Sequence, residues 1–322
     1  MRPWKSLLTL AVFAAMTGTA AAQAIGMGVG AAGFWTNSAG AAIAKVANDA
    51  GVKMRIQPFT GTTVYVPSID NGQLEFGLAN HLESYQAVHG VGLWGGKKLD
   101  NIRVVTVISP LRVTLFVKKD SPIKRVSDLK GKRVTTDYSA QKIVQLLVEG
   151  TLSSGGLTMN DIEQVKVPNV VRGATDFAAG KADAFFFALG AGKVAETDAA
   201  VGGIRALGID PSPGALQRLQ KYIPVGYGDL VQPAPHLPGV VGPTRILAYD
   251  YLALAGKDTP AELVYQVTKA MHGGKAGLAA AFKPLAEFDP AKMAKELGKG
   301  LEYHPGAIKF YREIGAWPPK SS

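Results

Sequence analysis

The stretch GVGAAGFW contains a glycine pattern that is typical of nucleotide-binding turns. Gly28, Gly30 and Gly33 stand in the spacing G-x-G-x-x-G, which begins within a predicted buried strand, IGMGVG, and extends into the turn after it. In a dinucleotide-binding unit, an acidic residue about twenty positions further on holds the ribose at the end of the second strand. Here the second predicted strand ends in Gln57-Pro58-Phe59-Thr60, without a carboxylate. The pattern therefore predicts helix-start amides that suit an anion, and no NAD or FAD cofactor.

Two further turns have the same character. FTGTT follows the second strand and places Thr60 and Thr62 on either side of Gly61. TTDYSAQ follows a strand of the second half of the chain, with Asp137 or Ser139 as the expected N-cap of the next helix. Ligands of open α/β sheets bind beyond the carboxyl ends of the strands. We expect the three turns to converge at a cleft between two lobes and to hold a carboxylate there.

The candidate ligand-binding residues lie in or near these turns. Phe34 and Trp35 are expected to line the cleft, with packing under the first helix as the alternative. The threonines act as helix caps, as ligand contacts, or as both. The full set consists of Gly33, Phe34, Trp35, Thr60, Gly61, Thr62, Asn80, His81, Arg112, Tyr138, Ser139, Gln141 and Phe187.

Several candidates have a structural alternative. Asn80 and His81 end a predicted strand, where site residues gather, but a lone histidine more often has a structural role. Arg112, next to the expected hinge, suits a bidentate contact to a carboxylate, with solvent exposure as the alternative. Tyr138 is expected to face the cleft unless it caps or packs. Phe187 lies on a wholly apolar strand, where plain core is the alternative. The other histidines are scattered, so no metal site is expected.

Composition limits the chemistry further. The chain has no cysteine, which excludes disulfides, cysteine-ligated zinc and thiol nucleophiles. It also lacks the G-x-S-x-G, H-E-x-x-H and P-loop patterns, so no enzyme activity is expected, although a few enzymes share the expected architecture. The net charge of +10 favours anionic partners. Basic residues do not cluster with aromatic ones, so nucleic acid is not an expected partner.

The first 24 residues predict a signal peptide. Arg2 and Lys5 precede a short apolar run, and the small residues of TAAAQA follow it. Cleavage before Gln23 and cleavage before Ile25 both fit the small-x-small rule. The protein is therefore expected to be periplasmic or otherwise extracytoplasmic.

Predicted strands and helices alternate in two α/β units. The first unit contains strands at 25–30, 52–59 and 74–80 with helices between them, which indicates a parallel sheet. The run NIRVVTVISPLRVTLFVKKD, broken at Ser109-Pro110, is expected to leave one sheet and enter another. The glycine- and proline-rich segment 211–243 is interpreted as a connection that returns to the first unit. The predicted organisation is a signal peptide (1–24), a first lobe (25–111 and 236–322) and a second lobe (112–235).

Six segments, in order along the mature chain, resemble the TAXI family, the solute receptors of tripartite ATP-independent periplasmic (TRAP) transporters. They are GMGVGAAGFWTNSAGAAIAKV, FTGTTVYVPSIDNGQLEFGLAN, LFVKKDSPIKRVSDLKGKRVTT, ATDFAAGKADAFFFALG, PAELVYQVTKAM and HPGAIKFYREIGAW. The resemblance implies an α/β, type II periplasmic-binding-protein fold with two lobes joined by a hinge. It also implies ligands such as glutamate, glutamine and related dicarboxylates.

The chain departs from the usual family motifs at the expected site. Phe34 and Trp35 take the aromatic positions of the first motif, and FTGTTVYV replaces STGGSVEN. Asn80-His81-Leu82 stands where a glutamine-serine-aspartate-like run is usual. The bulkier stretch 137–141 replaces PGSGT. The resemblance therefore implies the fold without implying glutamate as the ligand.

The expected function is capture of a small organic anion between the lobes by a monomeric receptor that delivers it to a TRAP membrane permease. Ligand bridging both lobes stabilises the closed form, since only that form offers contacts from both sides. The alternatives are a ligand-loaded sensor that docks on a signalling protein and an enzyme built on the same two-lobed fold.

Overall fold

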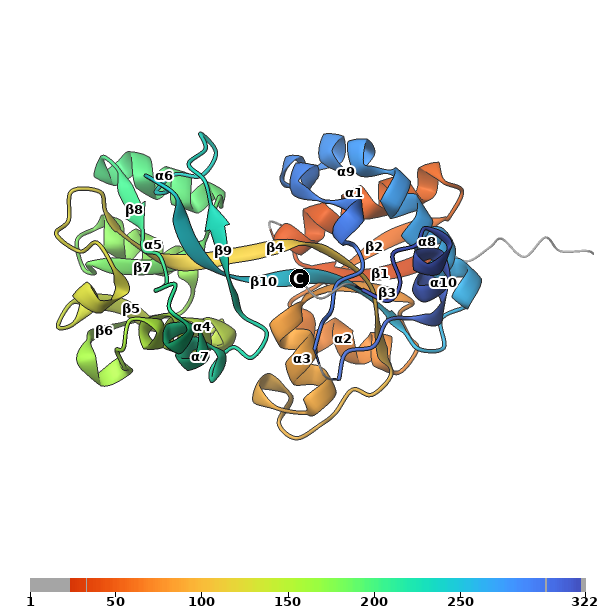
Figure 1. Ribbon diagram of the computed structural model, residues 1–322, viewed down its shortest axis with the longest axis horizontal. Helices are drawn as coiled ribbons and strands as arrows, with labels where there is room; N and C mark the ends of the chain where they lie inside the picture. Colours follow the sequence, from red (N-terminus) through yellow and green to blue (C-terminus); the bar gives the residue numbers. More distant parts are fainter. Residues whose placement is uncertain (1–23, 33, 299, 320–322) are drawn as a thin grey trace, which may run out of the picture.

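The computed structural model describes residues 24–32, 34–298 and 300–319. The predicted signal peptide up to residue 23 and Gly33 lie outside these residues. Figure 1 shows two lobes joined by two long strands, β4 and β10, that pass through both of them. Helices cover both faces of the sheet in each lobe.

The first lobe is built by both ends of the chain. Its N-terminal elements are β1 (Ile25–Gly30), α1 (Trp35–Asp49), β2 (Met54–Phe59), α2 (Thr62–Asp70), β3 (Phe76–Asn80), α3 (His81–His89) and the short 3-10 helix η1 (Gly92–Trp94). Its C-terminal elements are α8 (Ala261–Gly273), α9 (Lys275–Ala281), η4 (Lys283–Glu287), η5 (Pro290–Lys292) and α10 (Pro305–Glu313). The predicted order of strand, helix, strand, helix, strand is confirmed, and β1 pairs in parallel with both β2 and β3.

The second lobe lies between the two crossing strands, β4 (Ile102–Lys118) and β10 (Thr244–Gly256). Its elements are η2 (Val126–Leu129), β5 (Arg133–Asp137), α4 (Lys142–Ser154), η3 (Met159–Asp161), β6 (Glu163–Val167), α5 (Val170–Ala178), β7 (Ala184–Ala188), α6 (Gly192–Val201), β8 (Ile204–Ala206), α7 (Pro213–Gln220) and β9 (Tyr227–Val231). The segment 211–243, interpreted from sequence as a connection, thus contains a helix and a strand of this lobe.

The strands form one continuous sheet in the order β2-β1-β3-β10-β4-β7-β5-β6, with β8 on β4 and β9 on β10. The expectation of two separate sheets is wrong, because Ser109-Pro110 lies inside β4 and pairs with β10. The register shifts between Tyr251 and Leu252, opposite Ser109 and Val107, which leaves Ile108 without a counterpart. Such a bulge bends and twists a strand pair and tolerates a proline.

Small residues allow α1 to pack closely on the first-lobe sheet. Ala39, Ala42, Ile43 and Ala47 recur at helical spacing and are buried. A Cβ at Gly40 would lie 2.4 Å from a methyl carbon of Val29 on β1, so only glycine permits this approach. The close packing fixes the direction in which α1 begins, just beyond the carboxyl end of β1.

The hydrophobic clusters divide the molecule along the crossing strands. Val107 and Leu252 belong to the first-lobe cluster, whereas Val113 and Tyr249 belong to a second-lobe cluster. The segment from 236 to 249, which sequence reasoning gave to the first lobe, also packs with the second, for example through Ile246. We therefore propose that the second lobe runs from about 112 to about 249.

Candidate functional site

The carboxyl ends of the parallel strands of both lobes meet at the junction between the lobes. Asn80, at the end of β3, pairs with Tyr251 near the middle of β10. Ala188, at the end of β7, pairs with Val113 near the middle of β4. Parallel neighbours of these strands end at the same edges, so the helices that follow them begin there. The expectation that helix starts of both lobes border the junction is met by this register.

Four of these helices, α1, α2, α4 and α6, begin without a side-chain cap, and the first three follow the turns named from sequence. Phe34, Gly61 and Gln141 occupy the N-cap positions of α1, α2 and α4, and none of them accepts a side-chain hydrogen bond from the helix. Asp137 and Ser139, the N-caps expected from sequence, therefore do not cap α4. The first two backbone amides of α1, α2 and α4 make no hydrogen bond within the described residues: Trp35, Thr36, Thr62, Thr63, Lys142 and Ile143. Unpaired amides at helix starts attract anions.

Exposure at these starts fits a ligand site. Phe34 is 48% exposed, although an apolar side chain of this size is normally buried. Thr60 and Ser139 are also exposed, and Gly61 is half-buried. These residues remain candidates for ligand contact, as predicted.

Trp35 lies under the first turn and packs on the crossing strand. Its ring stacks on Tyr251, with centroids 4.1 Å apart and planes 3° apart, and Phe282 contacts its edge. The predicted aromatic pair thus divides into an exposed Phe34 and a half-buried Trp35. The stack connects the start of α1 directly to the strand that joins the lobes.

Glu83 is a buried carboxyl group that sequence reasoning missed. Its oxygens accept hydrogen bonds from the Thr62 hydroxyl and the Asn80 side-chain amide, and its backbone amide donates to the Asn80 oxygen at 2.8 Å. Burial raises the pKa of Glu83, and the two hydrogen bonds oppose this shift. Thr62 and Asn80 are therefore occupied by Glu83. The signal was present in the sequence as Asn80-x-x-Glu83, a helix-start pattern.

His81 is structural rather than available to a ligand. It is 5% exposed, and its Nε2 lies 3.0 Å from the Leu297 carbonyl oxygen. Burial lowers the pKa of His81 to about 4, and the Asp250 carboxylate opposes this shift. The ring is neutral at ordinary pH and ties α3 to the C-terminal segment. The assignment of His81 to the ligand site is therefore corrected.

Tyr138 and Phe187 are also core residues. Tyr138 is fully buried, its hydroxyl lies 2.7 Å from the Thr135 hydroxyl, and it packs in the second-lobe cluster with Leu82 of the first lobe. Phe187 is 8% exposed and packs on the other face of β7, with Phe116. Both side chains are buried in packing clusters, which favours the packing alternatives over a place in the ligand site.

Gln141 connects the starts of two second-lobe helices. Its Oε1 accepts a hydrogen bond from the Val170 amide at the start of α5, at 3.0 Å. The Gln141 carbonyl oxygen accepts a hydrogen bond from the Val144 amide, which is the first such bond at the start of α4. The contact holds the two helix starts side by side, so Gln141 positions the site.

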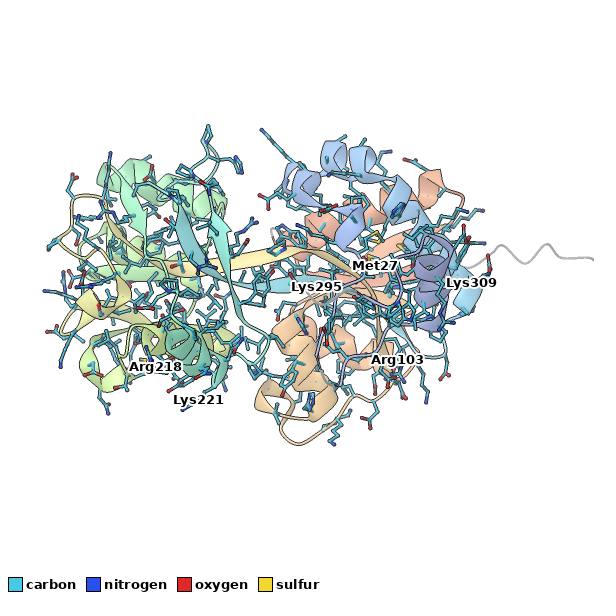
Figure 2. All side chains as sticks on the ribbon, viewed as in Figure 1. Met27, Arg103, Arg218, Lys221, Lys295 and Lys309 are labelled. Atoms are coloured by element: carbon cyan, nitrogen blue, oxygen red, sulfur yellow. The ribbon has the colours of Figure 1, made fainter. Side chains whose placement is uncertain are left out.

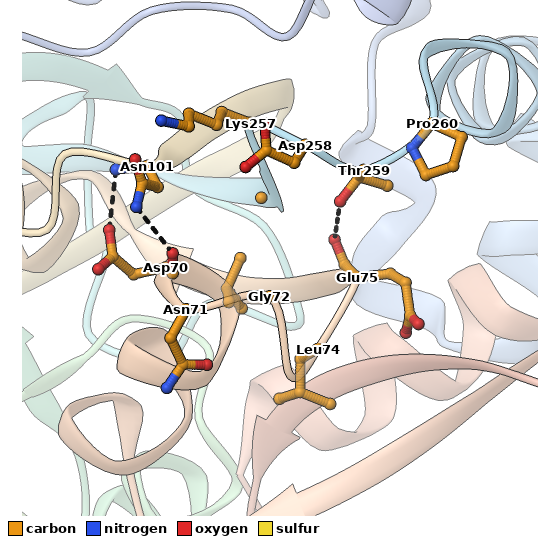
Figure 3. A pocket seen from close by; sticks show the side chains of 12 residues that line it. Asp70, Asn71, Gly72, Leu74, Glu75, Asn101, Lys257, Asp258, Thr259 and Pro260 are labelled. Atoms are coloured by element: carbon orange, nitrogen blue, oxygen red, sulfur yellow. Dashed lines mark hydrogen bonds between the residues drawn. The ribbon is translucent and has the colours of Figure 1, made fainter.

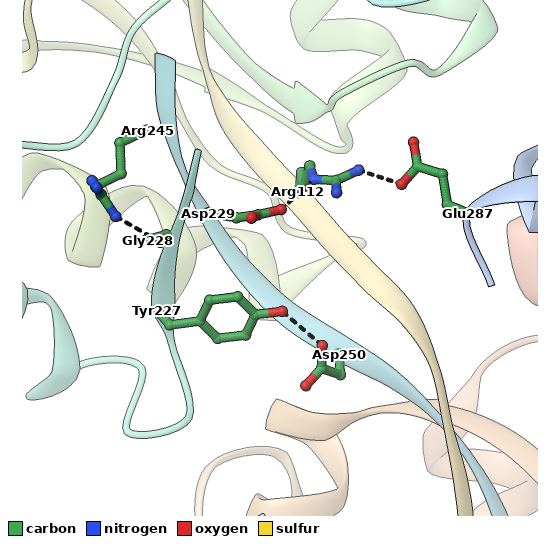
Figure 4. Close-up of polar contacts among 7 residues, drawn as sticks. All are labelled: Arg112, Tyr227, Gly228, Asp229, Arg245, Asp250 and Glu287. Carbon is green, nitrogen blue, oxygen red and sulfur yellow. Dashed lines mark hydrogen bonds and ion pairs between the residues drawn. The ribbon is translucent and has the colours of Figure 1, made fainter. Parts of the chain in front are cut away.

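Arg112 is engaged by two carboxylates. Its Nε lies 2.6 Å from Asp229 on β9, and its Nη1 lies 2.5 Å from Glu287 of the first lobe, as Figure 4 shows. The expected pairing of Arg112 with a ligand carboxylate competes with both contacts. In this structure Arg112 instead joins the second lobe to the C-terminal part of the first.

A second polar group lies beside it at the junction. Asp250 on β10 accepts hydrogen bonds from the Tyr227 hydroxyl and the Lys295 ammonium, both at 2.7 Å. Lys295 also lies 4.2 Å from the centre of the Tyr227 ring. Figure 2 places Lys295 close to the crossing strands and Lys309 on the far side of the first lobe. Asp250 is 3% exposed at its side chain, so these partners compensate a buried charge.

A pocket lies between the lobes next to the α4 start. Gln86, Gly92 and Leu93 line it from the first lobe, and Lys142, Ile143 and Leu146 line it from α4. Its volume is about 180 Å³ and its walls are predominantly apolar. Sequence reasoning named none of these six residues, because their contact depends on how α3 and α4 meet across the junction.

A larger pocket of about 350 Å³ lies at the opposite edge of the first lobe (Figure 3). It is lined around Asp70, Glu75, Asn101 and Thr259, close to the pair Gly256–Ile102 at the outer end of the crossing strands. The Asp70 carboxylate accepts a hydrogen bond from the Asn101 backbone amide, and the Glu75 carbonyl oxygen accepts one from the Thr259 hydroxyl. Its position away from the helix starts separates it from the site at the junction.

Two classes of feature are missing from the part of the chain that the structure describes. It contains no group of three or more histidine, aspartate or glutamate side chains arranged to hold a metal ion. No helix within it combines the length and the apolar character needed to span a membrane.

Three solved structures illustrate what the fold is similar to. A TctC solute-binding protein from Polaromonas is 14% identical, with 83% of this chain and 90% of that chain covered and a TM-score of 0.54. The GluR0 ligand-binding core in complex with L-glutamate is 11% identical, with 83% and 99% covered and a TM-score of 0.50. The aliphatic sulphonate binding protein SsuA from Escherichia coli is 15% identical, with 83% and 79% covered and a TM-score of 0.45.

The predicted fold class is confirmed: two α/β lobes of the periplasmic-binding-protein type, joined by paired crossing strands. A family model with the description NMT1-like family matches residues 28–315, which span both lobes and the crossing strands. The chain belongs to the NMT1-like family.

Proposed function

We propose that this protein is an extracytoplasmic receptor that binds a small organic anion between its lobes and does no chemistry on it. The observation that carries the proposal is the set of uncapped helix starts at the strand ends that border the junction, among them α1 and α2 of the first lobe and α4 of the second. Several amides at the positive ends of helices stabilise a carboxylate without a full positive charge.

The best-supported ligand contacts are Phe34, Thr60, Gly61 and Ser139, together with the amides at the three helix starts. Trp35, Thr62, Asn80 and Gln141 hold these elements in place through contacts inside each lobe. The proposal fits the predicted signal peptide and the predicted net positive charge. It also fits the fold shared with a solute-binding protein.

A thermal-shift screen tests the function. A ligand that binds only the folded protein raises the melting temperature by mass action. We expect some members of a panel of amino acids, dicarboxylates and aromatic acids to do so, and the corresponding primary amides to fail. Calorimetry should give one ligand per chain, with the acid recovered unchanged. Stabilisation by neutral analogues to the same degree, or turnover of the acid, would contradict the proposal.

The TRAP subtype and the compartment are separate parts of the proposal. They rest on the resemblance to the TAXI family and on the leader-like residues 1–24. Expression with the native N-terminus, followed by mass spectrometry of the periplasmic fraction, should find a chain that begins at Gln23 or Ile25. Ligand uptake into vesicles that contain the cognate TRAP permease should require the receptor. A retained leader or receptor-independent uptake would contradict these parts.

A further inference from the structure

The interlobe pocket next to α4 contains an unsatisfied polar group. Gln86 is 5% exposed, and its Oε1 is buried without a hydrogen-bond partner among the described residues. Buried amide oxygens in folded proteins are almost always paired, so an unpaired one calls for an explanation. The absence of a side chain at Gly92 makes room for the Gln86 amide, since a Cβ at this position would lie 2.6 Å from the Gln86 side chain.

The remaining walls are suited to an apolar group. Leu93, Ile143 and Leu146 line the pocket together with Lys142. Lys142 is exposed and forms no ion pair within the described residues, so its ammonium remains in water while its stem packs. A volume of about 180 Å³ exceeds the roughly 150 Å³ cavity that admits benzene.

The pocket adjoins the anion site directly. Lys142 and Ile143 line the pocket, and their backbone amides are the amides of the α4 start that make no hydrogen bond within the described residues. A carboxylate at those amides would therefore leave the rest of the same molecule next to Leu146 and Gln86. The Lys142 ammonium adds a positive charge at the rim.

We propose that this pocket is the subsite for the apolar part of the ligand, and that the ligand is a medium-chain or aromatic carboxylate with a hydrogen-bond donor, such as a hydroxyl, that pairs with Gln86. This inference rests on the proposed function and narrows its ligand class. Short dicarboxylates leave the pocket unfilled and bury no apolar surface in it. An acid with about six apolar carbons fills it, which is the size of a benzene ring.

A chain-length series measured by calorimetry tests the subsite. For acetate, butyrate, hexanoate and octanoate we expect the affinity to rise about fourfold for each buried methylene and to level off near six carbons. Leu146→Trp should fill the pocket and flatten this dependence, so that octanoate loses much more affinity than acetate. Ile308→Trp, at a half-buried position on α10, is the matched control and should keep the full dependence.

The hydrogen bond to Gln86 is tested with a matched ligand pair. The native protein should bind 6-hydroxyhexanoate about tenfold more tightly than hexanoate, because only the hydroxyl pairs with the buried Gln86 Oε1. Gln86→Leu should abolish this preference, because the hydroxyl is then buried without a partner. Gln164→Leu, at an exposed position of the second lobe, is the control.

The outcomes separate this inference from the function on which it rests. If short and long acids bind equally well in the native protein, the pocket only seals the contact between the lobes and the subsite is wrong, while the receptor function stands. If no acid of any length binds, the proposed function itself fails. A chain-length dependence that survives Leu146→Trp would place the apolar group elsewhere and overturn the subsite.

Discussion

Two buried titratable groups stand two residues apart on the first turn of α3. Burial lowers the pKa of His81 to about 4 and raises the pKa of Glu83, so it disfavours the charged form of both. The consequences for stability have opposite signs. The folded state binds fewer protons than the unfolded state at His81, and more protons at Glu83, within the respective pH windows.

His81 should make the protein less stable in mild acid. As the pH falls from 6.5 towards 4, the unfolded chain takes up a proton at this position that the folded chain refuses. The expected loss is about 3 kcal/mol over this window, and His81→Asn should remove most of the slope. Urea unfolding at half-unit steps of pH measures it. The exposed His236→Asn is the control, and an unchanged slope in His81→Asn would refute the argument.

Glu83→Gln should change the stability as the pH rises above about 4.5, rather than as it falls. Glutamine retains an oxygen for Asn80 and a donor for the Thr62 hydroxyl, and it cannot ionise. Stability of the native protein attributable to Glu83 is complete below about pH 4.5 and decreases as the pH rises. The advantage of the variant should therefore grow as the pH rises above 4.5 in the same unfolding series, until the pH passes the raised pKa of Glu83. A constant difference would mean that Glu83 titrates normally.

Tyr138→Phe distinguishes a core residue from a ligand contact. The variant loses the hydrogen bond to the Thr135 hydroxyl and should lower the free energy of unfolding by about 1 kcal/mol. Its affinity for an acid identified in the screen should remain within twofold of the native value. Phe34→Ala is the comparison, since an exposed site residue should lower affinity with little change in stability. A Tyr138→Phe variant with native stability and weakened binding would reverse the assignment.

For the predicted site residues, the sequence predicted where each residue stands along the chain better than it predicted where its side chain points. Phe34, Thr60 and Ser139 lie exposed at strand ends, as the pattern of turns predicted. Tyr138 stands in an equivalent place, but a positive φ of 46° turns its side chain into the core. Sequence periodicity carries no signal for such a reversal. The carboxylates that engage Arg112 lie more than one hundred residues away in the chain, so their contact follows only from the fold.

At the scale of elements, the turn after β5 is the most strained part of the site. Asp137 and Tyr138 both have positive φ values, 71° and 46°, a conformation that side chains with a Cβ disfavour. The turn is held by Gln145, which accepts from the Asp137 amide, and by the burial of Tyr138. Strain of this kind persists where the surroundings determine the backbone, as at a binding loop.

Asp137→Gly should relieve part of this strain. Asp137 is exposed and its carboxylate makes no hydrogen bond within the described residues, so the backbone conformation dominates the effect. We expect a gain of up to about 1 kcal/mol, reduced by the larger entropy of glycine in the unfolded chain. Asp137→Ala should be less stable than Asp137→Gly. Thermal melting measures both, and a glycine variant less stable than the alanine variant would contradict the strain argument.

The elements that sequence reasoning missed have specific physical causes. α3 follows β3 without any intervening loop, so the apolar strand pattern runs directly into Asn80 and the helix. β9 contains two glycine or polar positions among five residues and lies in a segment rich in proline and glycine. It is stabilised by pairing with β10 rather than by its own propensity. Strongly periodic elements such as α4 and β7 were predicted correctly because their burial pattern is one-sided or continuous.

At the scale of the whole molecule, polar links and an apolar contact join the two lobes. Arg112 links Asp229 to Glu287, and Lys295 lies against both Asp250 and the Tyr227 ring. Leu82 of α3 adds an apolar contact in the second-lobe core. The crossing strands are bulged between these contacts, at the pair Ser109–Tyr251. The sequence predicted two lobes and a hinge near Pro110, but the partners across the junction come from distant segments.

These contacts should set the distance between the lobes. The chain has no cysteine, so Lys45→Cys in the first lobe and Lys130→Cys in the second allow specific spin labelling at two exposed positions. Glu287→Gln with Lys295→Met removes one partner of each polar link between the lobes. We expect a longer and broader distance distribution in this variant by pulsed electron resonance, because it breaks the Arg112–Glu287 ion pair and leaves the buried Asp250 carboxylate without its Lys295 partner. An acid ligand should restore the shorter distance, since it favours the state that offers contacts from both lobes.

Lys309→Met with Glu262→Gln removes an ion pair within the first lobe as the control and should leave the distribution unchanged. A distribution that is the same in all three proteins would show that the bulged strands, and not these side chains, fix the angle between the lobes.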